Sequence, residues 1–159
     1  MMDKGQLKSL IEETLKEIDL YSEDAVNLLL GTAAQESAFG RYIKQLGNGP
    51  ALGIFQMEPA THYDIFSNYI FYKEDLKRKI VLTCQLAGPG SGIYDPDAGM
   101  LRWNLKYAIC MARIHYLRVP EPIPSTIEGY ANYWKDHYNT YLGAGTVEEI
   151  IHNYKKYVL

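Results

Sequence analysis

The stretch GTAAQESAFGRYIKQLGNGPALGIFQMEPATHY, residues 31–63, carries the strongest indications of fold and function in the chain. At its start, Leu29, Ala33, Glu36 and Gly40 follow one another at steps of three or four residues. In a helix this spacing puts Glu36 on the apolar face, where its carboxyl group would be partly desolvated. Glycine is typical of the residue that ends a helix, so we expect Glu36 in the last helical turn, facing the loop that follows.

The second half of the stretch predicts a loop and then another helix. Residues 45–51, QLGNGPA, are rich in glycine and proline, which favours a loop. The apolar segment GIFQM at residues 53–57 leads to Glu58 and Pro59, and proline is favoured at the first position of a helix. The arrangement therefore predicts an acid at a helix end that faces a cleft lined by backbone.

The composition is that of an ordinary globular domain. The 159 residues are 47% hydrophobic and 22% charged, with a net charge of −3. A chain of this length buries roughly two-thirds of its unfolded surface, so we expect one domain over residues 1–159. Because no basic cluster exceeds Lys77-Arg78-Lys79, nucleic acid is not an expected partner. We also expect a monomer.

The N-terminus, MMDKGQLKSLIEE, begins a charged amphipathic pattern and contains no apolar signal region. The chain also lacks an apolar run of about 18 residues, so we expect no stable membrane insertion. Synthesis in a cytoplasm without export by a signal peptide is therefore expected. Cys84 and Cys110 lie in apolar helical patterns and are expected to be buried free thiols rather than a disulfide.

Helical patterns continue along the rest of the chain. The longest, Asp97–Leu117, is the best candidate for a central core helix, and the glycine-rich segment Leu86–Tyr94 before it is expected to be a loop. Ser125 and Thr146 are each followed three residues later by glutamate, which is typical of a capping box. No strand pair is evident, so we predict an all-α domain of about seven helices. The predicted helices begin near Asp3, Ser22, Pro59, Asp75, Asp97, Ser125 and Thr146.

Three blocks of the chain resemble the signature of lytic transglycosylases. Residues 36–37 are similar to the family's Glu-Ser, residues 53–56 (Gly-Ile-Phe-Gln) to its Gly-Leu-Met-Gln, and residues 59–61 (Pro-Ala-Thr) to its Pro-x-Thr. The order of all three over about 26 residues is far more specific than any one block. Goose-type lysozymes, neighbours in the same superfamily, show similar spacing. The resemblance implies a single compact lysozyme-like domain.

The resemblance also implies a reaction, with Glu36 as the catalytic residue. A lytic transglycosylase cleaves the β-1,4 bond between N-acetylmuramic acid and N-acetylglucosamine in peptidoglycan and leaves 1,6-anhydromuramoyl ends. Glu36 would protonate the leaving oxygen while the acetamido group of muramic acid attacks C1, and would then take the proton of the C6 hydroxyl. Partial burial would raise the pKa of Glu36 and keep it protonated near neutrality.

By the same resemblance, several other residues would line the groove and bind the glycan. Two of them come from residues 128–139, which are similar to the family's Ala-Tyr-Asn-Ala-Gly block, whose tyrosine approaches the catalytic glutamate. Tyr133 is slightly favoured over Tyr130 for that place, and Trp103 and Trp134 are not placed in the site. Ser37 lacks the G-x-S-x-G setting of a nucleophile and is also interpreted as local structure. The residues expected to bind substrate are Ser37, Gly53, Phe55, Gln56, Glu58, Tyr130 and Tyr133.

Glu58 keeps two reactions open. Goose-type lysozymes carry an acid thought to position water at a similar place, so a hydrolase that uses Glu58 and water is the alternative. A simpler interpretation is that Glu58, next to Pro59, interacts with the positive end of a helix. A non-catalytic glycan-binding or structural phage module is a third reading. The four histidines form no H-E-x-x-H motif, so we expect no metal and no cofactor.

The family resemblance and the lack of an export signal together favour a bacteriophage lysin. The expected partner is the glycan strand of peptidoglycan. The protein would be made in the host cytoplasm and act on the cell wall as an endolysin, or be carried in the virion.

Overall fold

The computed structural model describes residues 1–86, 97–139 and 143–159. Eight α-helices and one 3-10 helix form this part of the chain, which contains no strand. The all-α prediction is therefore confirmed, while the loop expected at Leu86–Tyr94 lies, apart from its first residue, outside the described residues. The helices are α1 (Lys4–Glu17), α2 (Glu23–Ser37), α3 (Pro59–Asn68), η1 (Ile70–Tyr72), α4 (Glu74–Thr83), α5 (Met100–Trp103), α6 (Leu105–Leu117), α7 (Ile127–His137) and α8 (Val147–Tyr157).

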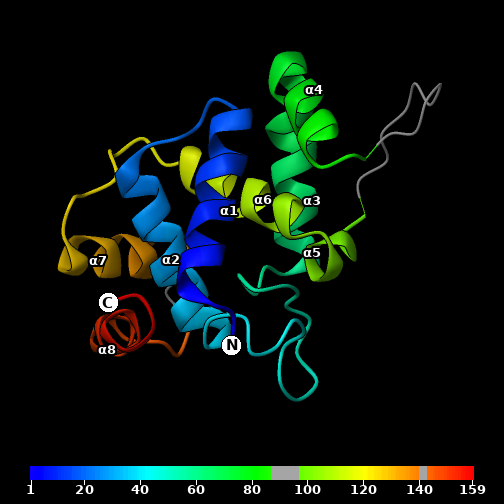
Figure 1. The fold of residues 1–159 in the computed structure, drawn as a ribbon. Coiled ribbons are helices and arrows are strands. Elements are labelled where there is room, and N and C mark those ends of the chain that lie inside the picture. Colours follow the sequence, from blue (N-terminus) through cyan, green and yellow to red (C-terminus); the bar gives the residue numbers. More distant parts are fainter. Residues whose placement is uncertain (87–96, 140–142) are drawn as a thin grey trace.

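Helix α6 is the centre of the fold and contacts each of α1 to α5 (Figure 1). Most of its side chains are buried, which confirms the expectation of a central helix in this region. The predicted continuous helix Asp97–Leu117 is wrong, however, because the chain divides at Asn104. Asn104 is extended, with φ −109° and ψ 98°, and its side-chain oxygen accepts the first-turn N–H of Tyr107 at 3.0 Å. An asparagine cap therefore separates α5 from α6 and accounts for one helix more than expected.

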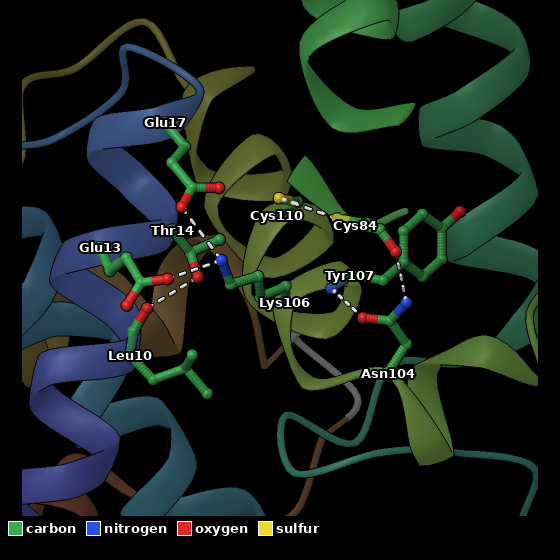
Figure 2. Close-up of polar contacts among 9 residues, drawn as sticks. All are labelled: Leu10, Glu13, Thr14, Glu17, Cys84, Asn104, Lys106, Tyr107 and Cys110. Carbon is green, nitrogen blue, oxygen red and sulfur yellow. Dashed lines mark hydrogen bonds and ion pairs between the residues drawn. The ribbon is translucent and has the colours of Figure 1, made fainter. Parts of the chain in front are cut away.

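Polar contacts connect the start of α6 to α1 and α4 (Figure 2). The Asn104 amide donates to the Cys84 carbonyl at 3.0 Å, and Lys106 forms ion pairs with Glu13 and Glu17 at 2.7 and 3.0 Å. The sulfur atoms of Cys84 and Cys110 lie 3.7 Å apart. Both cysteines are buried free thiols, as the sequence predicts.

Helix α2 begins as predicted but ends earlier. The Ser22 hydroxyl accepts the Ala25 N–H at 3.0 Å, which confirms the expected cap. The helix stops at Ser37 rather than near Gly40, because Ala38, Phe39 and Gly40 all have positive φ, at 48°, 62° and 74°. A left-handed backbone is costly for a bulky residue such as phenylalanine. Burial of the Phe39 side chain, which stacks on Tyr157 of α8 with ring centroids 6.3 Å apart, offsets this cost.

Helix α8 packs against both α2 and α7, near the bend that follows α2 (Figure 1). Its capping box is confirmed, since Thr146 accepts the Glu149 N–H at 3.2 Å and Glu149 accepts the Thr146 N–H at 2.8 Å. The box expected at Ser125 is wrong, because Thr126 caps α7 and the Ser125 hydroxyl instead donates to Asp24 at 2.9 Å. No helix in the described residues is long and apolar enough to span a membrane.

Candidate functional site

A cavity of about 480 Å³ lies beside the C-terminal end of α2. Its walls come from the last turn of α2, the segment between α2 and α3, the first turn of α3, the end of α6 and the residues after α7. Segments far apart in the sequence therefore meet at Glu36. The lining residues are Glu36, Tyr42, Gln45, Leu46, Ala51, Gln56, Met57, Glu58, Thr61, His115, Tyr138, Asn139 and Gly143.

Glu36 lies in the last turn of α2, as the sequence predicts, and its carboxyl group is largely desolvated. Burial raises the pKa of Glu36 from 4.5 to about 7, and a hydrogen bond from Trp134 opposes this rise. In that bond the indole Nε1–H donates to Glu36 Oε1 over 2.9 Å. At neutral pH both the acid and the carboxylate forms of Glu36 are therefore populated.

Trp134 contacts Glu36 although the sequence did not place it in the site. It lies on α7 and is fully buried. A buried indole N–H normally has a hydrogen-bond acceptor, and a buried acid is an obvious one. That signal was present in the sequence, but only the fold shows that the two residues meet.

The tyrosines of α7 are arranged differently from the expectation. The Tyr130 hydroxyl donates to Asp24 at 2.7 Å and the Tyr133 hydroxyl to the Glu121 carbonyl at 2.9 Å, and neither residue lines the cavity. Tyr138, one helical turn after Trp134, lines it instead. Successive helical residues point about 100° apart, so Tyr133 faces a different side from Trp134 and Tyr138. The expected placement of Tyr130 or Tyr133 next to Glu36 is therefore wrong.

The block at residues 53–56 forms a tight bend that presents Gln56 to the cavity. Leu52 and Met57 pair through two backbone hydrogen bonds of 2.9 and 3.0 Å, and the Gln56 amide donates to the Gly53 carbonyl at 2.8 Å. Gly53 and Phe55 do not line the cavity. The Phe55 carbonyl accepts the Tyr138 hydroxyl at 2.7 Å, so this bend supports the wall from behind.

Ser37 also has a structural rather than a cavity-lining position. It is fully buried, its hydroxyl donates to the Ile54 carbonyl at 2.7 Å, and it accepts the Gly40 N–H at 2.8 Å. These bonds connect the end of α2 to the bend at residues 53–56. Of the residues expected to bind substrate, the cavity therefore brings together Gln56 and Glu58 with Glu36, and leaves Ser37, Gly53 and Phe55 behind its wall.

Glu58 and His115 contribute two further polar groups to the cavity. Glu58 is the N-cap residue of α3 but makes no side-chain capping bond, and it is exposed. His115 comes from the central helix, and burial lowers its pKa to about 4, so its ring is neutral at neutral pH. The His115 ring packs edge-on against Tyr138, with centroids 4.9 Å apart. No sequence motif distinguishes His115 from the other histidines.

Tyr42 and Lys135 form hydrogen bonds that connect the segments around the cavity. The Tyr42 hydroxyl donates to the Glu36 backbone carbonyl at 2.9 Å. The Lys135 ammonium group donates to Asn139, to the Gly143 carbonyl and to the Gly145 carbonyl at 3.1, 3.0 and 2.7 Å. A single lysine thus fixes both ends of the segment that follows α7.

Beside the exposed Glu58, the cavity offers one acid with a pKa of about 7, a neutral imidazole, amides and hydroxyls. These groups suit an uncharged, polar ligand such as a sugar.

Among the described residues, no cluster of three or more His, Cys, Asp or Glu side chains is arranged to hold a metal ion. No protein-family model, curated protein or solved structure matches this chain.

Proposed function

We propose that this protein is a peptidoglycan lytic transglycosylase in which Glu36 acts first as a general acid and then as a general base. The observation that carries the proposal is the desolvated Glu36 carboxyl group at the cavity wall, with a pKa of about 7. A group with a pKa near the working pH can both donate and accept a proton efficiently. An ordinary surface glutamate would be ionised and would have no proton to donate.

In the first step, the Glu36 proton would pass to the glycosidic oxygen that leaves C1 of N-acetylmuramic acid. The acetamido oxygen of the same sugar forms a bond to C1 as the glycosidic bond breaks, which gives a cyclic oxazolinium ion. Glu36 is then a carboxylate, next to the positive charge that has developed. The substrate's own acetamido group replaces the second carboxylate that most glycosidases need.

In the second step, the Glu36 carboxylate would take the proton of the C6 hydroxyl group. The C6 oxygen attacks C1, the bond between C1 and the acetamido oxygen breaks, and the 1,6-anhydro ring closes. The proton gained by Glu36 replaces the proton that it gave away. No water enters the product, and the enzyme returns to its starting state.

The resemblance of residues 36–37, 53–56 and 59–61 to the family's blocks supports this choice of substrate and reaction. The gathering of Gln56 and Thr61 from the last two blocks around the Glu36 cavity is consistent with it. On this proposal the partner is the glycan strand of a bacterial cell wall. A bacteriophage endolysin or virion lysin is the setting that we propose.

Hydrolysis is a second candidate because Glu58 lines the same cavity and is exposed. A Glu58 carboxylate could activate water on the opposite face of the sugar, as the base does in inverting glycosidases. A non-catalytic glycan-binding module is less favoured, since glycan binding alone does not require a desolvated acid with a raised pKa.

The product of wall digestion distinguishes the two reactions. We expect purified protein to release muropeptides that end in 1,6-anhydromuramic acid, because the C6 hydroxyl rather than water attacks C1. Digestion in water labelled with ¹⁸O, followed by mass spectrometry, measures this directly. Predominantly reducing ends, each carrying one labelled oxygen, would instead assign hydrolysis and place Glu58 in the catalytic machinery. Failure to release any muropeptide from walls of several bacterial types would reject both reactions.

The proposed role of Glu36 also predicts how the rate depends on pH. The free enzyme must hold the proton, so kcat/KM should fall as the pH rises through about 7, the pKa of Glu36. Initial rates on purified walls between about pH 5 and pH 9 test this expectation. Glu58→Gln is the matched control and should keep the same profile. A rate that stays constant across this range would contradict the assignment.

A further inference from the structure

We propose that Trp134 is a positioning residue that determines which carboxyl oxygen of Glu36 carries the transferable proton, an inference that rests on the proposed function of Glu36. The indole Nε1–H donates to Glu36 Oε1 over 2.9 Å. An indole nitrogen is a donor only, so Oε1 must act as the acceptor in this contact. A carbonyl oxygen is a better acceptor than a carboxylic hydroxyl oxygen, so this contact favours the protonated form with its hydrogen on the other oxygen, Oε2. The contact thus selects one of two otherwise equivalent protonated forms.

The packing around Trp134 makes this selection rigid. The indole is fully buried and packs in a small apolar cluster with Ala131 and Ile150. A Cβ atom added to Gly145 would lie only 2.6 Å from the indole ring, so the segment before α8 closes tightly over it. Because the ring has no room to turn, its N–H direction is set by α7 before any substrate binds.

The same bond acts on the carboxylate that remains after proton transfer. A hydrogen bond to an ionised acceptor is shorter and stronger than one to a neutral acceptor, so the indole favours the charged form of Glu36. This opposes the effect of burial, which favours the neutral form. Trp134 would thereby keep Glu36 able to switch between acid and base, whereas burial alone would hold it as an acid.

Several titratable groups near Glu36 have pKa values far from 7, and the Glu58→Gln substitution removes another group. From α6, His115 has a pKa lowered to about 4 and Tyr116 a pKa raised well above 10, both by burial. Tyr42 and Tyr138 have pKa values raised above 10 by burial and by the Glu36 charge. Glu58 lines the same cavity. The ammonium group of Lys135, which precedes Asp136 and follows Trp134 in the sequence, donates a hydrogen bond to the Gly143 carbonyl.

The first test uses the wild-type protein and needs no activity. The chain has two tryptophans, so its spectrum holds two indole N–H resonances, and Trp103 is 68% exposed and serves as the internal control. The Trp134 resonance should shift with a midpoint near pH 7, which is the pKa of Glu36. The shift should vanish in Glu36→Gln, which keeps an oxygen acceptor but does not ionise. A Trp134 resonance that does not titrate, or that still titrates in Glu36→Gln, would overturn the proposal.

The second test is Trp134→Phe, with Trp103→Phe as the matched control. Removing the donor should move the upper limb of the pH–rate profile to higher pH by about one unit and lower kcat about tenfold or more. Trp103→Phe should change neither. A folded Trp134→Phe protein with the wild-type profile would overturn the inference. If this variant does not fold, the indole titration of the wild-type protein still decides it. If the wild-type protein cleaves no wall but the titration is as expected, only the proposed function fails.

Discussion

Replacing Glu36 by glutamine should lower wall-degrading activity by at least about a hundredfold while leaving the fold intact. Glutamine keeps the volume of the side chain and an oxygen that can accept the Trp134 N–H, so the contact of 2.9 Å has a counterpart in the variant. What it lacks is the transferable proton. Loss of turbidity of outer-membrane-permeabilised cells, together with release of anhydromuropeptides, measures the effect.

Glu58→Gln is the control for this substitution, because it also removes one carboxyl group from the same cavity. Under transglycosylation it should reduce activity far less than Glu36→Gln, since in that reaction only Glu36 donates and accepts the proton. A Glu36→Gln protein that retains more than about a tenth of the wild-type rate would reject Glu36 as the general acid. Equal loss in both variants would favour hydrolysis.

Glu36→Gln should also make the protein more stable at alkaline pH. The pKa of Glu36 is about 7 in the folded protein and 4.5 as a reference for the unfolded chain, so the folded state binds the proton more tightly. Its contribution to stability is therefore complete below pH 4.5 and is lost as the pH rises through 7. The loss amounts to at most about 3 kcal/mol, and glutamine avoids it because it does not ionise. Urea denaturation above neutral pH should show the full gain, which should decrease as the pH falls and disappear below pH 4.5.

Gly53→Ala should lower the free energy of unfolding by about 3 kcal/mol or more. Gly53 has φ +77°, which is unfavourable for alanine, and an added Cβ would overlap the Leu101 carbonyl oxygen. That oxygen belongs to the backbone of α5 and cannot turn away as a flexible side chain would. Chemical denaturation monitored by circular dichroism measures the loss. The bend that presents Gln56 would shift as well, so activity should fall in parallel.

Gly47→Ala separates the two causes. Gly47 has almost the same backbone angle, φ +79°, but an added Cβ would meet nothing within 4 Å. Only the conformational cost remains, which is about 1 kcal/mol. Equal destabilisation by the two substitutions would mean that the contact with Leu101 is not what requires glycine at position 53.

The local features of this fold were predictable from the sequence. The steps of three and four residues before Glu36 are sufficient to define α2 and to place the acid in its last turn. Thr146 and Glu149 specify a capping box within four residues of chain. The end of α2 was less predictable, because Ala38 and Phe39 have a left-handed backbone whose cost is offset by the burial of Phe39 against Tyr157.

The parts of the site that the sequence did not reveal depend on how α7 faces α2. Both Tyr133 and Trp134 are buried, so apolar periodicity alone cannot say which of them points toward Glu36. The answer depends on the rotation of α7 about its axis, which the packing of α8 against both helices determines. The role of His115 was not predictable either, because the sequence alone does not show that the end of α6 borders the cavity.

A ribosome makes Glu36 long before it makes the residues that bury it. Trp134 follows 98 residues later, and α8, which packs on α2, emerges later still. During translation the N-terminal elements emerge first, so Glu36 would at that stage be a solvated carboxylate without a proton to give. The pKa of about 7 is therefore acquired only when the rest of the chain folds around the end of α2 and buries Glu36. A nascent chain that ends before α7 therefore carries Glu36, but not the proton that Glu36 holds near neutral pH in the folded protein.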